Sequence, residues 1–72
     1  MSRENEIQRI VYLNLFNNKI KKLECMDALP NLMTLILSFN EIEEIEGLTK
    51  NTKLGKLDLS HNFIRQVKNL QS

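Results

Sequence analysis

The sequence predicts an α/β solenoid in which three similar turns of chain stack on one another as one small domain. Three observations predict this fold: the 72-residue chain matches itself every 22 residues, each match begins with alternating apolar and polar residues, and an asparagine follows at the same place. Alternation is typical of a short strand, and a unit that cannot bury its apolar side alone must stack on its neighbours. We therefore expect an arc with short parallel strands on its concave face and irregular or 3₁₀ return segments on its convex face.

The repeat is clearest in its apolar positions. When the chain is written in rows that begin at Ile10, Leu32 and Leu54, six columns contain only apolar residues. At 42% apolar content, a complete match over six columns in three rows has a chance of about 10⁻⁷, so the period reflects the fold. The columns are Leu13, Leu35 and Leu57; Leu15, Leu37 and Leu59; Ile20, Ile42 and Ile64; Leu23, Ile45 and Val67; Met26, Leu48 and Leu70; and the row starts themselves.

The segment before the first repeat, residues 1–9, is mostly polar. Ile7 is its one apolar residue after Met1, so we expect a partial cap over the first repeat. Three repeats follow at 10–31, 32–53 and 54–72. The sequence ends two residues after Leu70, and we expect a C-terminal cap to be absent.

Each repeat changes its local period midway. The first repeat alternates at Leu13-Asn14-Leu15, which predicts a strand, and its later apolar residues are spaced by three. Spacing of three suits an irregular or 3₁₀ segment better than a long α-helix. Asn51 stands where the first repeat has Leu29, which makes the second return segment less apolar.

An asparagine column follows the strands, at Asn18, Asn40 and Asn62. After each strand the chain must turn, and this leaves backbone N–H and C=O groups buried without ladder partners. An inward amide carries two donors and an acceptor, so it can bridge the loops of adjacent repeats. An aspartate would bring an unpaired charge and a leucine would leave the backbone unsatisfied. We therefore expect these asparagines to be structural.

The stretch from Leu32 to Leu48 follows the pattern L-x-x-L-x-L-x-x-N-x-I-x-x-I-x-x-L and resembles the leucine-rich repeat. Its 22-residue period is similar to the subclass found in the leucine-rich regulatory subunit of nuclear protein phosphatase 1. The resemblance covers Ile10 to Leu70. It implies a protein-binding role, with a phosphatase catalytic subunit, a dynein or a ribonucleoprotein component as the candidate partner.

The candidate binding surface consists of the outward strand residues and the residues just after the strands. Among them Tyr12, Phe16, Ile36 and Phe39 are apolar at positions that the pattern makes solvent-facing, and polar residues surround them. Such a cluster is typical of a protein-binding hot spot. Two alternatives stay open: these side chains pack on one another across strands, or they contact further repeats or a second copy. The full set is Tyr12, Asn14, Phe16, Thr34, Ile36, Ser38, Phe39, Lys56, Asp58, Ser60 and His61.

Catalytic chemistry has no support in the sequence. Ser38 and Ser60 have no evident base, and a lone His61 does not make a metal site. The two glycines, Gly47 and Gly55, are too few for a phosphate-binding loop. We expect a protein that is not an enzyme and that holds no cofactor or metal.

Charge and cysteine content give expectations about partners and location. Ten Lys and Arg against nine Asp and Glu give a net charge of +1, so direct binding to nucleic acid is not expected. The longest apolar run is Ile10 to Leu13, which is too short to cross a membrane, and no membrane contact is expected. The single Cys25 excludes an internal disulfide and favours a reducing compartment, so we expect an intracellular, cytoplasmic or nuclear protein.

Two functions remain after these exclusions. The first is a non-catalytic module that binds a protein partner through its concave strand face. The alternative is a structural unit, or a fragment of a longer repeat protein, that self-associates through uncapped ends. The strand expected at 56–60 presents an open edge, although Lys53 and Lys56 could discourage pairing there. Columns of opposite charge, such as Lys21 with Glu43 and Lys22 with Glu44, should help to order the stack.

Overall fold

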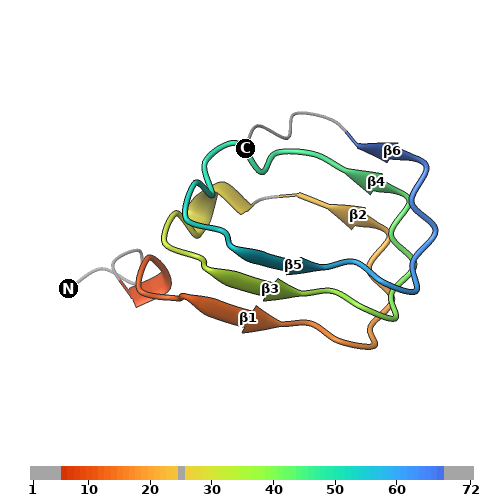
Figure 1. The fold of residues 1–72 in the computed structure, drawn as a ribbon, viewed down its shortest axis with the longest axis horizontal. Coiled ribbons are helices and arrows are strands. Elements are labelled where there is room, and N and C mark those ends of the chain that lie inside the picture. The colour runs from red at the N-terminus through yellow and green to blue at the C-terminus, as the bar shows by residue number, and fades with distance from the viewer. Residues whose placement is uncertain (1–5, 25, 68–72) are drawn as a thin grey trace.

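A computed structural model describes residues 6–24 and 26–67, in which six short strands form two parallel sheets (Figure 1). The first sheet has the order β1-β3-β5 and the second has the order β2-β4-β6. We call the strand pairs β1 with β2, β3 with β4, and β5 with β6 the first, second and third coils. The elements are β1 (Tyr12–Asn14), β2 (Lys22–Leu23), the 3₁₀ helix η1 (Met26–Ala28), β3 (Thr34–Ile36), β4 (Glu44–Ile45), β5 (Lys56–Asp58) and β6 (Gln66–Val67).

The strand register follows the sequence repeat. Leu13 pairs with Leu35 and Leu35 pairs with Leu57, so each coil lies 22 residues from the next. Because alternate strand residues point to opposite faces, one face of the first sheet carries the leucine column. The other face carries the residues on either side of each leucine, including Tyr12 and Asp58.

The return segments differ from their expected irregular or 3₁₀ form, because each contains a two-residue strand. The register of this second sheet places Lys22 opposite Glu44. Backbone hydrogen bonds continue this second sheet beyond the strands, since Glu43 N–H donates to Lys21 C=O at 3.0 Å. The return segments of neighbouring coils run parallel to one another, so their backbone N–H and C=O groups can pair between coils. This pairing favours extended backbone over a 3₁₀ turn. Within the described residues the 3₁₀ form occurs at η1 alone.

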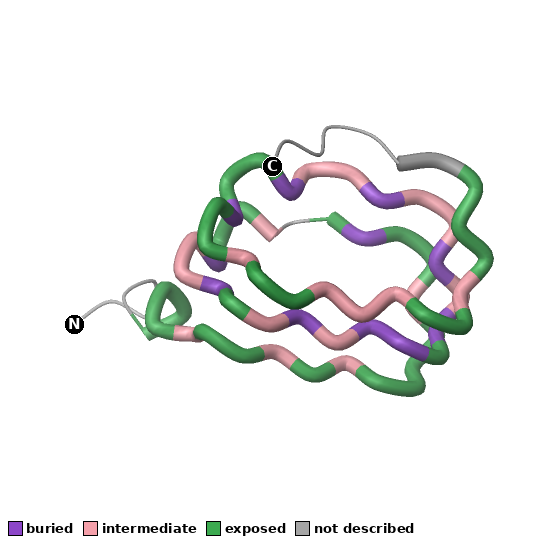
Figure 2. Tube along the Cα trace, viewed as in Figure 1, coloured by how far each residue is buried: buried purple, intermediate pink, exposed green. Residues whose placement is uncertain are grey.

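The core lies mainly in the second coil (Figure 2). Of the eight buried apolar residues, six lie between positions 32 and 48, and Leu35 and Leu37 have no exposed surface. Their counterparts in the outer coils are partly exposed, because each outer coil has a described neighbour on one side only. The partly buried set is Ile10, Leu13, Leu15, Ile20, Met26, Leu54, Leu57 and Leu59.

A short turn precedes the first coil, at residues 6–9, to one side of the sheets (Figure 1). Arg9 N–H donates to Glu6 C=O at 3.1 Å, and Asn31 Nδ2 donates to Gln8 C=O at 2.7 Å. Ile7 remains 40% exposed. The rest of the expected cap, residues 1–5, lies outside the described residues, as do Cys25 and the expected core residue Leu70.

Candidate protein-interaction surface

The asparagines after the strands join neighbouring coils. Asn40 Oδ1 accepts from the N–H groups of Asn18 and Ile20 at 3.1 and 3.2 Å, and its Nδ2 donates to Leu15 C=O at 3.0 Å and to Leu37 C=O at 2.9 Å. The side chain therefore satisfies backbone groups of two coils at once, and its residue is only 4% exposed. This arrangement supports a structural role for the column.

The asparagine of the third coil makes the same kind of bonds to the coil before it, whereas the side chain of the first coil's asparagine bonds only within its own coil among the described residues. Asn62 Oδ1 accepts from Ile42 N–H at 3.0 Å, and its Nδ2 donates back to Leu37 C=O at 2.9 Å. Asn18 lies at the edge of the stack and is exposed, with its Nδ2 on Leu15 C=O at 2.9 Å within its own coil. The amides of Asn40 and Asn62 thus each bond to the coil before their own.

A second buried amide, Asn51, stands out in the sequence only as a departure from an apolar column. It is 4% exposed, and its Nδ2 donates to Met26 C=O at 2.9 Å and to Leu29 C=O at 2.8 Å. Asn51 Oδ1 has no hydrogen-bond partner among the described residues. The side chain therefore ties the loop of the second coil to that of the first, which a leucine could not do.

The outward residues of the first sheet are unevenly exposed. Tyr12 is 58% exposed, whereas Thr34 and Ile36 on the middle strand are half-buried. Ser38 is only 5% exposed, so the expectation that it faces solvent is wrong. It follows β3, which has strands on both sides, and neighbouring coils therefore cover positions that alternation alone makes solvent-facing.

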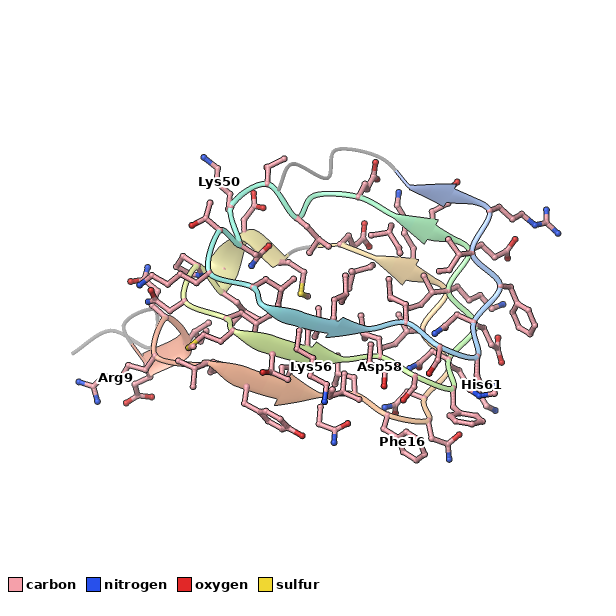
Figure 3. The ribbon with its side chains drawn as sticks, in the orientation of Figure 1. Arg9, Phe16, Lys50, Lys56, Asp58 and His61 are labelled. Atoms are coloured by element: carbon pink, nitrogen blue, oxygen red, sulfur yellow. The ribbon has the colours of Figure 1, made fainter. Side chains whose placement is uncertain are left out.

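An aromatic row of Phe16, Phe39 and His61 crosses the three coils just after the strands. The Phe16 and Phe39 rings meet edge to face with centroids 5.5 Å apart, and the Phe39 and His61 rings stack at 4.1 Å. Phe16 and Phe39 are 52% and 47% exposed, which is unusual for large apolar side chains in contact. Figure 3 shows Phe16, Asp58 and His61 gathered at this end of the first sheet, away from Arg9 and Lys50.

An open hollow of about 840 Å³ lies beside the aromatic row. Phe63 contributes to it and is 64% exposed, and the strand pattern in the sequence did not predict this residue. Phe63 occupies the column of Lys19 and Glu41, so an aromatic in a charged column was the available signal. The hollow is lined by Asn17, Asn18, Lys19, Phe39, Asn40, Glu41, His61 and Phe63.

The residues just before the asparagines have left-handed backbone. Asn17, Phe39 and His61 have φ of 57°, 60° and 57°. Asparagine and histidine are enriched in this conformation, whereas a bulky phenylalanine is a true outlier in it. The Phe39 ring, carried by this strained residue, lies between those of Phe16 and His61.

Two of the expected binding residues also stabilise strand ends. Asn14 Oδ1 accepts from Phe16 N–H at 2.9 Å, and Asp58 Oδ1 accepts from Ser60 N–H at 3.0 Å and from Ser60 Oγ at 2.7 Å. The Ser60 hydroxyl and then its N–H hold the pKa of the Asp58 carboxyl below its ordinary value of 3.8. Asp58 therefore stays ionised beside His61 at neutral pH.

Ion pairs on the return face follow the charged columns in part. Arg65 Nε lies 3.4 Å from Glu43 Oε1, between residues of one column. Lys22 Nζ lies 3.0 Å from Glu46 Oε1, two residues beyond the Glu44 that aligns with it. The bond to Glu46 raises the pKa of the exposed Lys22. Both pairs are open to solvent, where such contacts order the surface and add little stability.

Clusters of metal-ligating side chains are absent from the part of the chain that the structure describes. No three His, Cys, Asp or Glu side chains of those residues lie close enough together to hold a metal ion. Likewise, residues 6–24 and 26–67 include no helix with the length and apolar character to cross a membrane.

Parallel strands at a 22-residue spacing, with an amide bridging each pair of coils, define a repeat protein built by stacking. Comparison with known sequences identifies the family: a profile described as leucine-rich repeats in two copies matches residues 30–72. The chain belongs to the leucine-rich repeat family. Leucine-rich repeats are modules that mediate protein–protein interaction. No solved structure matches the chain at a significant level.

The chain is similar to leucine-rich repeat-containing G-protein coupled receptor 5 from three mammals. The rat protein is 43% identical over 58 residues, which is 78% of this chain and 6% of the receptor. The bovine protein is 44% identical over 57% of this chain and 4% of the receptor, and the human protein is 43% identical over 58% of this chain and 5% of the receptor. The chain thus spans about one-twentieth of these relatives.

The relatives correct the expected location. G-protein coupled receptors are membrane proteins, and this finding overturns the expectation of a purely intracellular, cytoplasmic or nuclear protein. It also leaves the expected lack of membrane contact without support. The resemblance to the phosphatase regulatory subclass and the partners it implies remain predictions.

Proposed function

We propose that this chain is a non-catalytic protein–protein interaction module that binds a protein partner through the outer face of its first sheet. This face is the concave side of the stack, and the return segments with the second sheet form the convex side. The observation that carries the proposal is the aromatic row, where two phenylalanines stay about half exposed while in contact. The binding residues are Tyr12, Asn14, Phe16, Thr34, Ile36, Phe39, Lys56, Asp58, Ser60 and His61, with Phe63 added and Ser38 removed.

The backbone supports this proposal. A bulky residue at positive φ costs stability, and strain of this kind gathers at functional sites. Phe39 carries such strain while its ring stays 47% exposed. Packing within the chain therefore leaves about half of this residue open, and a partner would cover it. Strands also fix the neighbouring side chains before binding, which lowers the entropy lost on association.

The repeat organisation belongs to the same proposal. We take residues 1–9 as a partial polar cap and 10–31, 32–53 and 54–72 as the three repeats. The binding role of leucine-rich repeats is carried over to this chain, and the receptor activity of the relatives is not, because the chain covers about 6% of the rat receptor. A phosphatase catalytic subunit, a dynein and a ribonucleoprotein component are partners to test directly.

Affinity capture followed by binding of the purified partner tests the surface. Phe16→Ala and Phe39→Ala should each reduce partner binding by about tenfold or more, since exposed aromatics dominate such interfaces. Met33→Ala is the matched control, because Met33 is 54% exposed before β3, at the far end from the aromatic row. Equal binding by the parent and by both phenylalanine variants would contradict the proposal.

A second candidate function is assembly through the open ends of the stack. The observation that favours it is the partial exposure of the leucine columns in the first and third coils, whose counterparts Leu35 and Leu37 are fully buried. A further coil on either side would cover these residues. Light scattering across a concentration range tests this function, since association should raise the measured mass.

A further inference from the structure

We infer that the two ends of the stack are complementary to each other, so that copies of this chain associate head to tail, with the β5 edge of one copy on the β1 edge of the next. The inference deepens the assembly function and rests on it. It is independent of the aromatic row as a partner-binding surface. Its basis is the pattern of bonds between coils, which recurs with a shift of 22 residues.

The first part of the pattern lies at the strand ends, where each coil donates to the coil after it. Leu15 N–H donates to Ile36 C=O at 2.8 Å, and Leu37 N–H donates to Asp58 C=O at 2.8 Å. The next group in this series is Leu59 N–H, which has no such bond within the described residues. The acceptors Ile36 and Asp58 are equivalent residues of the second and third coils, and the equivalent acceptor of the first coil is Asn14 C=O. One more coil-to-coil step places Leu59 N–H of one copy against Asn14 C=O of the next.

The second part lies at the strand starts, where bonds run in the opposite sense. Met33 N–H donates to Val11 C=O at 2.8 Å, and Gly55 N–H donates to Met33 C=O at 2.9 Å. Continued by one step, the series places Val11 N–H of one copy against Gly55 C=O of another. Both edges thus carry donors and acceptors, and the two sets match when copies stack head to tail.

The asparagine column sets the same direction. Asn40 Oδ1 accepts two N–H groups of the first coil, and Asn62 Oδ1 accepts one of the second. In the described structure Asn18 Oδ1 accepts none, because no described coil lies before it. The Ile64 N–H continues the donor series of Ile20 and Ile42, so it would reach Asn18 Oδ1 of the following copy.

The apolar surfaces agree with this register. Ile64 is 36% exposed and Ile20 is half-buried, whereas Ile42 between them has no exposed surface. A head-to-tail contact sets Ile64 of one copy beside Ile20 of the next and repeats the packing already present inside the stack. Two contacts oppose association, because Arg65 shares a column with Lys21 and Lys53 shares a column with Arg9, and each pair would place two positive charges side by side. Salt screens this repulsion, and association should strengthen as salt is raised.

Matched variants at the two ends test the inference by sedimentation equilibrium. Ile64→Lys blocks the β5 end and Ile20→Lys blocks the β1 end, each with a charge that an apolar contact disfavours, so each alone should associate at least about tenfold more weakly than the parent. Mixed together they should form a 1:1 complex with nearly parental affinity, because each retains the end that the other lacks. Circular dichroism checks folding, and Asn18→Lys replaces Ile20→Lys if the latter does not fold.

The outcomes of this experiment distinguish a failure of the head-to-tail arrangement from a failure of the assembly function on which it rests. A parent chain that stays monomeric at every concentration overturns both the assembly function and the inference. A parent that associates while one variant alone still forms dimers, or while the mixture forms no complex, overturns the head-to-tail arrangement and leaves assembly standing. Head-to-tail contacts do not close on themselves in pairs, so the parent should also exceed the mass of a dimer.

Discussion

At the scale of single residues, the left-handed backbone at Asn17, Phe39 and His61 shows how one geometry is met by different side chains. Each φ lies between 57° and 60°, because the chain turns at the same place in every coil. Asparagine fits this conformation at little cost and phenylalanine does not. The second coil therefore carries backbone strain at the residue that supplies its aromatic ring.

Replacing Phe39 with asparagine should separate stability from binding. Phe39→Asn relieves about 1 kcal/mol of backbone strain and loses ring contacts of a similar size, so the free energy of unfolding should stay within about 1 kcal/mol of the parent value. Partner binding should nevertheless fall by about tenfold or more. Urea unfolding and a binding titration measure the two effects. A large loss of stability would show that the ring is a packing element instead.

The buried Asn40 should matter far more to stability than the exposed Asn18. Asn40→Ala leaves backbone groups of two coils without partners and should cost about 2–3 kcal/mol. Asn18→Ala removes bonds within one exposed loop and should cost less than about 1 kcal/mol. Urea unfolding of both variants gives the comparison. Equal losses in the free energy of unfolding would mean that the hydrogen bonds between coils add no more stability than those within one loop.

Acid should weaken the turn at Asp58. Its folded-state pKa lies below the ordinary value of 3.8, so its contribution to stability is present above about pH 5 and is lost as the pH falls through 3.8 and then the folded pKa. Asp58→Asn keeps the acceptor, as Asn14 does in the first coil, and removes the titration. Between pH 5 and pH 2 the parent should lose more stability than this variant, as thermal unfolding would show. Parallel pH profiles would contradict this assignment.

The sequence predicted the exposure of a residue correctly where its own place in the strand sets that exposure. The prediction failed where the adjacent coils set it. The strand alternation placed Tyr12 correctly on an exposed face. The same rule placed Ser38 there wrongly, because coils on both sides cover the position. Phe63 lies beyond the strands, where alternation predicts nothing, and the bonds of Asn51 exist only once the coils are stacked.

At the scale of elements, the first sheet could be predicted and the second could not. Alternation around Leu13, Leu35 and Leu57 reports a strand locally, and the 22-residue shift gives its register. The second sheet depends on pairing between coils, and two-residue strands such as Lys22–Leu23 are too short to leave an alternating pattern. Spacing of three therefore did not distinguish a 3₁₀ turn from extended chain.

The same substitution should have unequal effects along the leucine column. Leu35→Ala removes a fully buried side chain and should cost about 2–5 kcal/mol, enough to unfold a domain of this size. Leu57→Ala acts on a half-buried side chain and should cost about half as much. Circular dichroism and urea unfolding would show a lost transition for the first variant and a shifted one for the second. Equal costs would mean that the third coil is covered as fully as the second.

At the scale of the whole molecule, composition was a poor guide to location. A single cysteine favours a reducing compartment, yet the similar proteins are membrane receptors. A chain of 72 residues with one cysteine is too short for cysteine content to report the compartment. The stacking pattern is repeated in every coil, so it identifies the family even in a short chain.

Lengthening the stack from within should raise stability and leave its ends unchanged. A duplicate of residues 32–53 inserted after Lys53 adds one coil with neighbours on both sides, and stability in stacked repeats grows with each added interface. The midpoint of urea unfolding should rise, and the dependence on urea should steepen by about a third because four coils unfold in place of three. Self-association should keep its parental dissociation constant within about threefold, since Ile20 and Ile64 still form the two ends. If the insertion abolished association, the contact would lie on a face of the sheets and not at the ends of the stack.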